Sequence, residues 1–97
     1  MARYDIFSGS NAELLLDCQA DALSRFETRF VVPLLPALGA QAATRLHPVF
    51  SVGETRFIMV THLASAVAKR DLGPKVGSLA DEHVTIMNAL DMLLTGY

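Results

Sequence analysis

One long segment with helical periodicity, residues 78–94, lies near the end of this chain and limits the folds open to it. Apolar residues recur at helical spacing from Leu79 to Leu93, as in a helix that packs one face on a core. Ser78 suits the N-cap and Gly96 suits the residue that ends a helix. The preceding segments are mostly short extended runs, so we expect a mainly β domain with one C-terminal helix.

A first hairpin is predicted near the N-terminus. Residues 3–7 and 13–19 both alternate between apolar and polar side chains, which is the pattern of half-buried strands. Residues 8–11, with the sequence Ser-Gly-Ser-Asn, separate the two runs and are typical of a turn.

A second hairpin is predicted in the middle of the chain. Residues 49–52 and 55–60 flank the pair Gly53-Glu54, and glycine at the first central position suits a two-residue hairpin turn. The apolar run at residues 57–60 is continuous, which favours a strand buried on both faces.

Residues 29–35 predict a further strand that contains Pro33. Proline has no N–H to donate, so we expect this strand to lie at a sheet edge or to carry a bulge. Residues 36–44 are expected to form a loop, and residues 67–72 a short edge strand. The whole chain, residues 1–97, is therefore interpreted as a single domain, a small β-barrel or curled antiparallel sheet packed by the helix.

The composition predicts self-association. A chain of 97 residues has no room for a second core, and its residues are 52% hydrophobic and 19% charged, which excludes intrinsic disorder. So many apolar residues exceed what one small core can bury, and large exposed apolar patches usually mark interfaces. We expect a homodimer, with contacts near Val31 to Leu35 and along the C-terminal helix.

Charge and cysteine content bear on partners and compartment. The net charge is −2 and no basic cluster is present, so direct nucleic-acid binding by this chain is not expected. Cys18 is the one cysteine and cannot form an internal disulfide, which fits a reducing compartment. The N-terminus lacks a signal-peptide core, and the apolar run at 30–40 is shorter than the ~20 residues of a membrane span. A cytoplasmic protein is expected.

The three histidines, His47, His62 and His83, do not show the spacing of metal ligands, so no zinc site is predicted. Arg45 and His47 lie two residues apart, and hence on one face of an extended segment. In phosphodiester cleavage a base accepts a proton while a cation stabilises developing charge. A ribonuclease that uses this pair is therefore an alternative function.

The C-terminal segment has a distinct character. From Val76 onward it contains acidic residues but no lysine or arginine, and it ends in Thr95-Gly96-Tyr97. One interpretation is a frayed terminus after an ordinary packing helix. The other is a helix tip that presents a terminal aromatic residue to a protein partner, because tyrosine is enriched at interfaces.

Several short sequence blocks follow the first hairpin in a characteristic order along nearly the whole chain, and a penultimate Gly96 ends the series. The blocks are Phe30-Val31-Val32-Pro33-Leu34, Leu46-His47-Pro48-Val49, Val52-Gly53-Glu54, Leu63-Ala64-Ser65 and Asn88-Ala89-Leu90. This order resembles the CcdB-type toxins of toxin–antitoxin systems. The resemblance implies an SH3-like barrel with a C-terminal helix, a homodimer, no catalytic activity, and neither cofactor nor metal.

The resemblance also implies partners and site residues. Such toxins bind the A subunit of DNA gyrase and are neutralised by a CcdA-like antitoxin, and the pair represses its own operon, so DNA is contacted only through the antitoxin. The family's terminal Trp-Gly-Ile aligns with Thr95-Gly96-Tyr97, where only the glycine matches. The implied gyrase-binding residues are Asn88, Asp91, Thr95, Gly96 and Tyr97, and the expected dimer-interface residues are Val31, Val32, Pro33, Leu34 and Leu94.

Two alternatives remain open beside a plasmid-maintenance toxin that inhibits gyrase. One is a MazF-like endoribonuclease toxin that uses Arg45 and His47. The other is a non-toxic relative that only binds an antitoxin.

Overall fold

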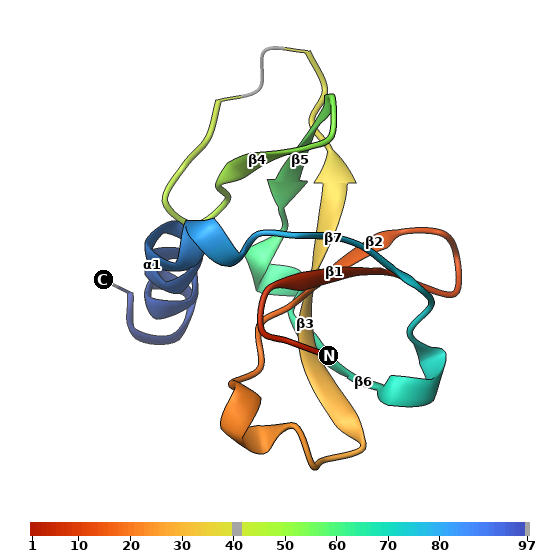
Figure 1. Ribbon diagram of the computed structural model, residues 1–97. Coiled ribbons are helices and arrows are strands. Elements are labelled where there is room, and N and C mark those ends of the chain that lie inside the picture. The colour runs from red at the N-terminus through yellow and green to blue at the C-terminus, as the bar shows by residue number, and fades with distance from the viewer. Residues whose placement is uncertain (40–41, 97) are drawn as a thin grey trace.

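The computed structural model describes residues 1–39 and 42–96. In this part of the chain one curled antiparallel sheet carries one α-helix against its side (Figure 1). The strands are β1 (Asp5–Ser8), β2 (Leu14–Asp17), β3 (Thr28–Pro36), β4 (Val49–Val52), β5 (Thr55–Met59), β6 (Ser65–Ala68) and β7 (Lys75–Ser78). The helix is α1 (His83–Thr95), and the short 3-10 turns are η1 (Asp21–Leu23), η2 (Thr61–Leu63), η3 (Lys69–Asp71) and η4 (Ala80–Glu82). The predicted fold class is confirmed.

Both predicted hairpins are present. β1 pairs with β2, with Ile6 opposite Leu16. β4 pairs with β5 around Gly53, whose φ of 64° is the left-handed conformation that glycine adopts most readily. The local alternation of side chains and the turn residues were therefore sufficient to predict these four strands.

The prediction that the Pro33 strand lies at a sheet edge is wrong. β3 runs through the middle of the sheet, with β2 along one side and, on the other, β6 followed by β5. The partners in β6 end opposite Val31 and those in β5 begin opposite Leu34. Pro33 lies at this change of partner. On the side of β3 that faces β6 and β5, no ladder hydrogen bond needs an N–H from residue 33, so a proline is tolerated there.

The segment before the helix differs from the prediction. β6 ends at Ala68 and is followed by η3, and β7, which the sequence did not predict, pairs with β1. The Oγ of Ser78 accepts a hydrogen bond from the N–H of Ala80, but the N-cap of η4 is Leu79 and α1 begins only at His83. Among the described residues, no helix has the length and hydropathy that a membrane span requires.

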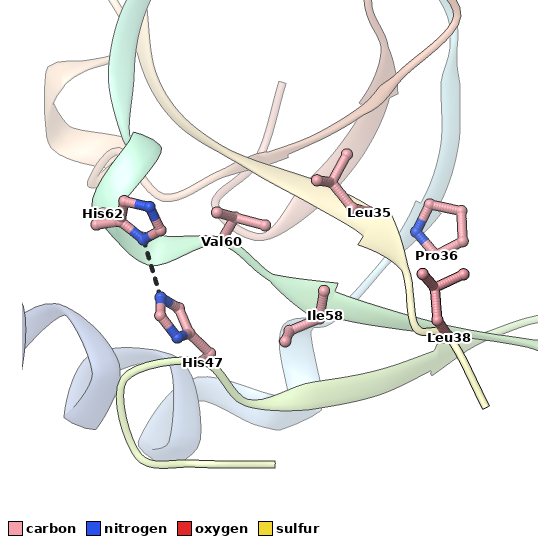
Figure 2. A pocket seen from close by; sticks show the side chains of 7 residues that line it. All are labelled: Leu35, Pro36, Leu38, His47, Ile58, Val60 and His62. Atoms are coloured by element: carbon pink, nitrogen blue, oxygen red, sulfur yellow. Dashed lines mark hydrogen bonds between the residues drawn. The ribbon is translucent and has the colours of Figure 1, made fainter. Parts of the chain in front are cut away.

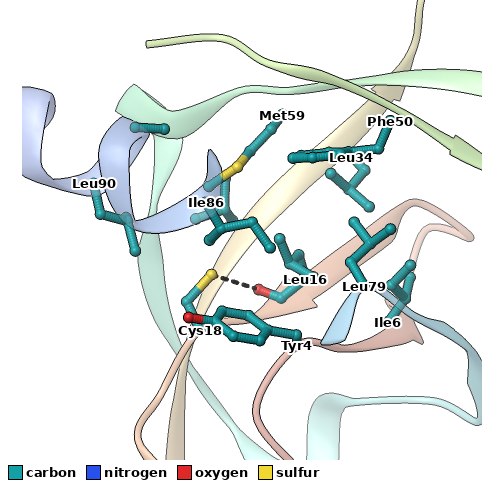
Figure 3. Packing of buried hydrophobic residues seen from close by; sticks show 12 residues of the cluster. Tyr4, Ile6, Leu16, Cys18, Leu34, Phe50, Met59, Leu79, Ile86 and Leu90 are labelled. Carbon is teal, nitrogen blue, oxygen red and sulfur yellow. Dashed lines mark hydrogen bonds between the residues drawn. The ribbon is translucent and has the colours of Figure 1, made fainter. Parts of the chain in front are cut away.

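The core lies between the sheet and α1 (Figure 3). Ile86, Ala89 and Leu90 of the helix are buried there. They belong to one cluster with side chains from the strands and their connections, which are Tyr4, Ile6, Leu16, Cys18, Val32, Leu34, Phe50, Met59 and Leu79. The helix therefore closes the open side of the curled sheet.

Candidate functional site

A surface pocket of about 340 Å³ lies at the end of β3 and beside β5 (Figure 2). Its wall is mostly apolar, and two histidines are its polar side chains. The lining residues are Leu35, Pro36, Leu38, His47, Ile58, Val60 and His62. An apolar hollow with a few convergent polar groups is the usual form of a binding site.

The two histidines contact each other directly. Nε2 of His47 and Nδ1 of His62 are 2.9 Å apart, and the rings meet edge to face with centroids 5.0 Å apart. Figure 2 shows both rings on the same side of the pocket, joined by this hydrogen bond. One imidazole donates an N–H and the other accepts it, so the pair is able to hold and transfer a proton.

The backbone holds the two histidines in register. His47 precedes β4 and His62 lies in η2, after β5. Oγ1 of Thr61 donates to the carbonyl of Leu46, and the N–H of Met59 donates to the carbonyl of Pro48 at 2.9 Å. The segments on either side of the histidine pair are therefore fixed to each other before any ligand binds.

The sequence analysis paired His47 with Arg45, whereas the structure places the ring of His47 against His62, 15 residues further along the chain. Arg45 is close to His47 in sequence, and its side chain is exposed to solvent. The predicted hairpin could have indicated the contact between His47 and His62. In this hairpin Val49 lies opposite Ile58, and continuing the same register brings residue 47 near residues 60–62.

The third histidine lies elsewhere. Nδ1 of His83 is 2.6 Å from the hydroxyl of Tyr4, at the start of α1. Burial raises the pKa of the Tyr4 hydroxyl, and the neighbouring Arg3 partly opposes this. In the described part of the chain, no group of three or more histidine, cysteine or acidic side chains could hold a metal ion together.

The C-terminal candidates share one face of α1. Asn88, Asp91 and Thr95 follow one another at helical spacing and are all exposed. Oγ1 of Thr95 donates to the carbonyl of Asp91 at 2.6 Å, and Gly96, with φ 80°, ends the helix. Tyr97 lies outside the described residues.

The predicted apolar stripe of the helix is only partly buried. Leu93 of the predicted stripe is 37% exposed, and the neighbouring apolar side chains of Leu94 and Val84 are 75% and 69% exposed. The buried side chains of α1 are Ile86, Ala89 and Leu90, all of which precede the last turn of the helix. The tip of α1 consequently presents apolar side chains to solvent.

The expected dimer-interface residues divide into two groups. Val31, Val32 and Leu34 are at most 1% exposed, because β3 is central in the sheet, so their side chains are not free to contact a second copy. Pro33 is half-buried and Leu94 is exposed, and for these two the interface stays a prediction.

Solved structures with the same fold include toxin ribonucleases. An endoribonuclease from a mycobacterial species matches with a TM-score of 0.78 at 16% identity, over 97% of this chain and 90% of that chain. An endoribonuclease in complex with its cognate antitoxin, also mycobacterial, matches with a TM-score of 0.80 at 15% identity, over 97% and 94% of the two chains. The expectation that this architecture implies no catalytic activity is therefore wrong, because enzymes share the fold.

The family comparison covers nearly the whole chain. The family model for CcdB protein matches residues 3–96, which include the pocket, the histidine pair and α1. The resemblance inferred from the order of the short blocks is thereby confirmed, and this chain belongs to the CcdB family.

Proposed function

We propose that this CcdB-family chain is the toxin of a toxin–antitoxin pair and that it binds the A subunit of DNA gyrase through the tip of α1. The observation that carries the proposal is the exposed apolar C-terminal end of α1, where Leu94 is 75%, Met92 38% and Leu93 37% exposed. Family membership supports the toxin role, and a structural neighbour bound to its cognate antitoxin supports antitoxin binding. The proposed site of action is the cytoplasm.

The tip of α1 has the properties of a protein-binding surface. Asn88, Asp91 and Thr95 form an exposed stripe that leads to the C-terminal end of α1, and Leu94 lies beside the end of this stripe. Burying one leucine side chain at an interface contributes about 1.5–3 kcal/mol. The same segment contains carboxylates and no lysine or arginine, which favours a partner surface that is basic at its rim.

A gyrase-binding assay that compares Leu94→Ser with a control variant, Val76→Ser, tests this proposal. Leu94→Ser removes the most exposed apolar side chain of α1, and Val76→Ser removes an apolar side chain that is 50% exposed on β7. Leu94→Ser should weaken binding to the gyrase A subunit about tenfold or more, and Val76→Ser should not. Thr95→Trp, which restores the family's aromatic residue, should strengthen binding. Equal affinities for the wild type and Leu94→Ser would contradict the assignment.

We also propose that the chain acts as a homodimer. Leu35 and Leu38, at the pocket, are 43% and 81% exposed, and a second copy would cover such apolar side chains. Sedimentation at micromolar concentration should show a species of twice 10.5 kDa. A single species of 10.5 kDa would contradict the dimer.

A second candidate function is RNA cleavage at the histidine pair. The specific observation is the 2.9 Å approach of His47 and His62 at the pocket. One imidazole would take the proton of a ribose 2′-hydroxyl, whose oxygen bonds to phosphorus as the bond to the 5′ oxygen breaks. The other, as an imidazolium, would give its proton to that leaving oxygen, and Arg45 would stabilise the phosphate charge.

Cleavage of single-stranded RNA separates the two functions. His47→Ala and His62→Ala should abolish cleavage, whereas His83→Ala, which alters the remaining histidine, should not. RNA with a 2′-deoxy sugar at the cleaved position should be resistant. If the wild type leaves RNA intact, this candidate is wrong. A chain that binds an antitoxin but neither gyrase nor RNA would be a non-toxic relative.

A further inference from the structure

We propose that His47 and His62 form a two-histidine site for a divalent transition-metal ion of the nickel, copper and zinc group. The proposal depends neither on gyrase binding nor on RNA cleavage, although its ligands are the same two histidines as those of the candidate cleavage site. It differs from the zinc site that the sequence spacing argued against, because it needs only two protein ligands. The evidence is the separation of the two ring nitrogens, the rigidity of the two segments, and the chemistry of imidazole.

The distance between the nitrogens matches a metal chelate. Nε2 of His47 and Nδ1 of His62 are 2.9 Å apart. When two imidazole nitrogens each lie about 2.05 Å from one ion and the N–metal–N angle is a right angle, the nitrogens are about 2.9 Å apart. A right angle between neighbouring ligands is the geometry of tetragonal copper and nickel sites, and the tetrahedral angle of zinc needs a separation only a few tenths of an ångström larger.

The protein holds this separation without a ligand. The hydroxyl of Thr61, next to His62, donates to the carbonyl of Leu46, next to His47. On the other side of His47, the carbonyl of Pro48 accepts the N–H of Met59. The N–H of His47 itself donates to Oγ1 of Thr44 at 3.0 Å. Little backbone entropy is lost on binding, because the segments that carry both ligands are already fixed to each other.

Metal binding requires a shift of one proton within the pair and a turn of the two rings, because in the hydrogen bond the facing nitrogens point at each other rather than at a common ion. In the hydrogen-bonded pair a single proton lies between the facing nitrogens. With metal bound, both facing nitrogens offer lone pairs, and the protons occupy Nδ1 of His47 and Nε2 of His62, so two neutral imidazoles bind without net loss of a proton.

The other coordination positions are available to small ligands. Within residues 1–39 and 42–96 no third histidine, cysteine or acidic side chain joins the pair, so water or an added ligand completes the shell. His62 is exposed and His47 half-buried at the pocket, which gives an ion a direct path from solvent. An open, exchangeable site follows.

Titration calorimetry of the untagged full chain with Ni²⁺, Cu²⁺ and Zn²⁺ at pH 7.5 tests the site. The wild type should bind one ion per chain, with copper the tightest. His47→Gln and His62→Gln should each weaken binding at least about tenfold, whereas His83→Gln should bind as the wild type does. Melting curves of all variants without metal verify folding, and paramagnetic Ni²⁺ should broaden NMR signals from residues 46–48 and 61–63.

Calorimetry and NMR measure metal binding itself, so their results do not depend on whether the chain binds gyrase or cleaves RNA. Wild-type affinity in His47→Gln or His62→Gln would overturn the site, as would a loss of binding in His83→Gln equal to that in the other two. Broadening centred on residues other than 46–48 and 61–63 would also overturn it.

Discussion

Replacement of Arg29 by methionine is the most severe test of how the sheet is held together. Both side chains of the Arg29–Asp17 pair are 0% exposed, and Nε and Nη2 of Arg29 both lie 2.7 Å from Oδ2 of Asp17. Asp17 also accepts the N–H of Gln19 at 3.0 Å. In Arg29→Met the carboxylate keeps that single hydrogen bond and loses its counter-ion inside the protein.

The expected cost is a large part of the total stability. Removing one partner of a buried ion pair costs about 3–5 kcal/mol, whereas a domain of this size has a free energy of unfolding of roughly 5–15 kcal/mol. At roughly 4–8 °C per kcal/mol, the melting temperature should fall by about 12 °C or more. The double variant Asp17→Asn/Arg29→Met should recover at least half of the loss, because no charge then stays buried and the asparagine still accepts from Gln19.

Urea unfolding and calorimetry, at one fixed protein concentration and pH 7.5, measure these differences. A loss under about 1 kcal/mol in Arg29→Met would refute the reasoning, since it would mean that the buried carboxylate needs no counter-ion. A double variant no more stable than Arg29→Met would show that the cost comes from packing of the arginine stem rather than from charge.

Three further predictions follow from the structure. Burial, and secondly the charge of Asp17, raise the pKa of the Cys18 thiol to about 12, so the native protein should not react with iodoacetamide at pH 8, although the urea-unfolded chain should. Because this folded pKa lies above the ordinary thiol value of 9.0, the contribution of the thiol to stability is complete below pH 9 and should be lost as pH rises toward about 12. Gly53→Ala should reduce the free energy of unfolding by about 1–2 kcal/mol in urea titrations, because φ is 64° in the β4–β5 turn. Ile86→Ala, at a side chain that is 0% exposed, should reduce it by about 2–5 kcal/mol.

The candidate site was predictable only in part. His47 was recognised as a possible base from its place beside Arg45, but its actual partner is His62. The contact depends on how far the two segments continue past the β4–β5 hairpin and on the Thr61–Leu46 hydrogen bond that joins them. Neither condition is visible as a short motif, because the two histidines are 15 residues apart.

The sequence by itself determined the elements whose signals are local. Alternation of side chains and the Gly53 turn define the β4–β5 hairpin, and helical spacing defines α1 from His83 onward. The order of short blocks was sufficient to identify the family. The hairpin and helix signals are local because each depends on neighbours within one strand pair or a few helical turns.

Only the tertiary structure decided the place of β3 and the face that α1 exposes. Pro33 suggested an edge strand, yet the change of partner from β6 to β5 places a proline in the centre of the sheet. Leu94 fits the helical spacing but is 75% exposed, because the residues of α1 that pack in the core end at Leu90. Which apolar side chains stay exposed is set by packing between distant segments, and short-range periodicity contains no information about that packing.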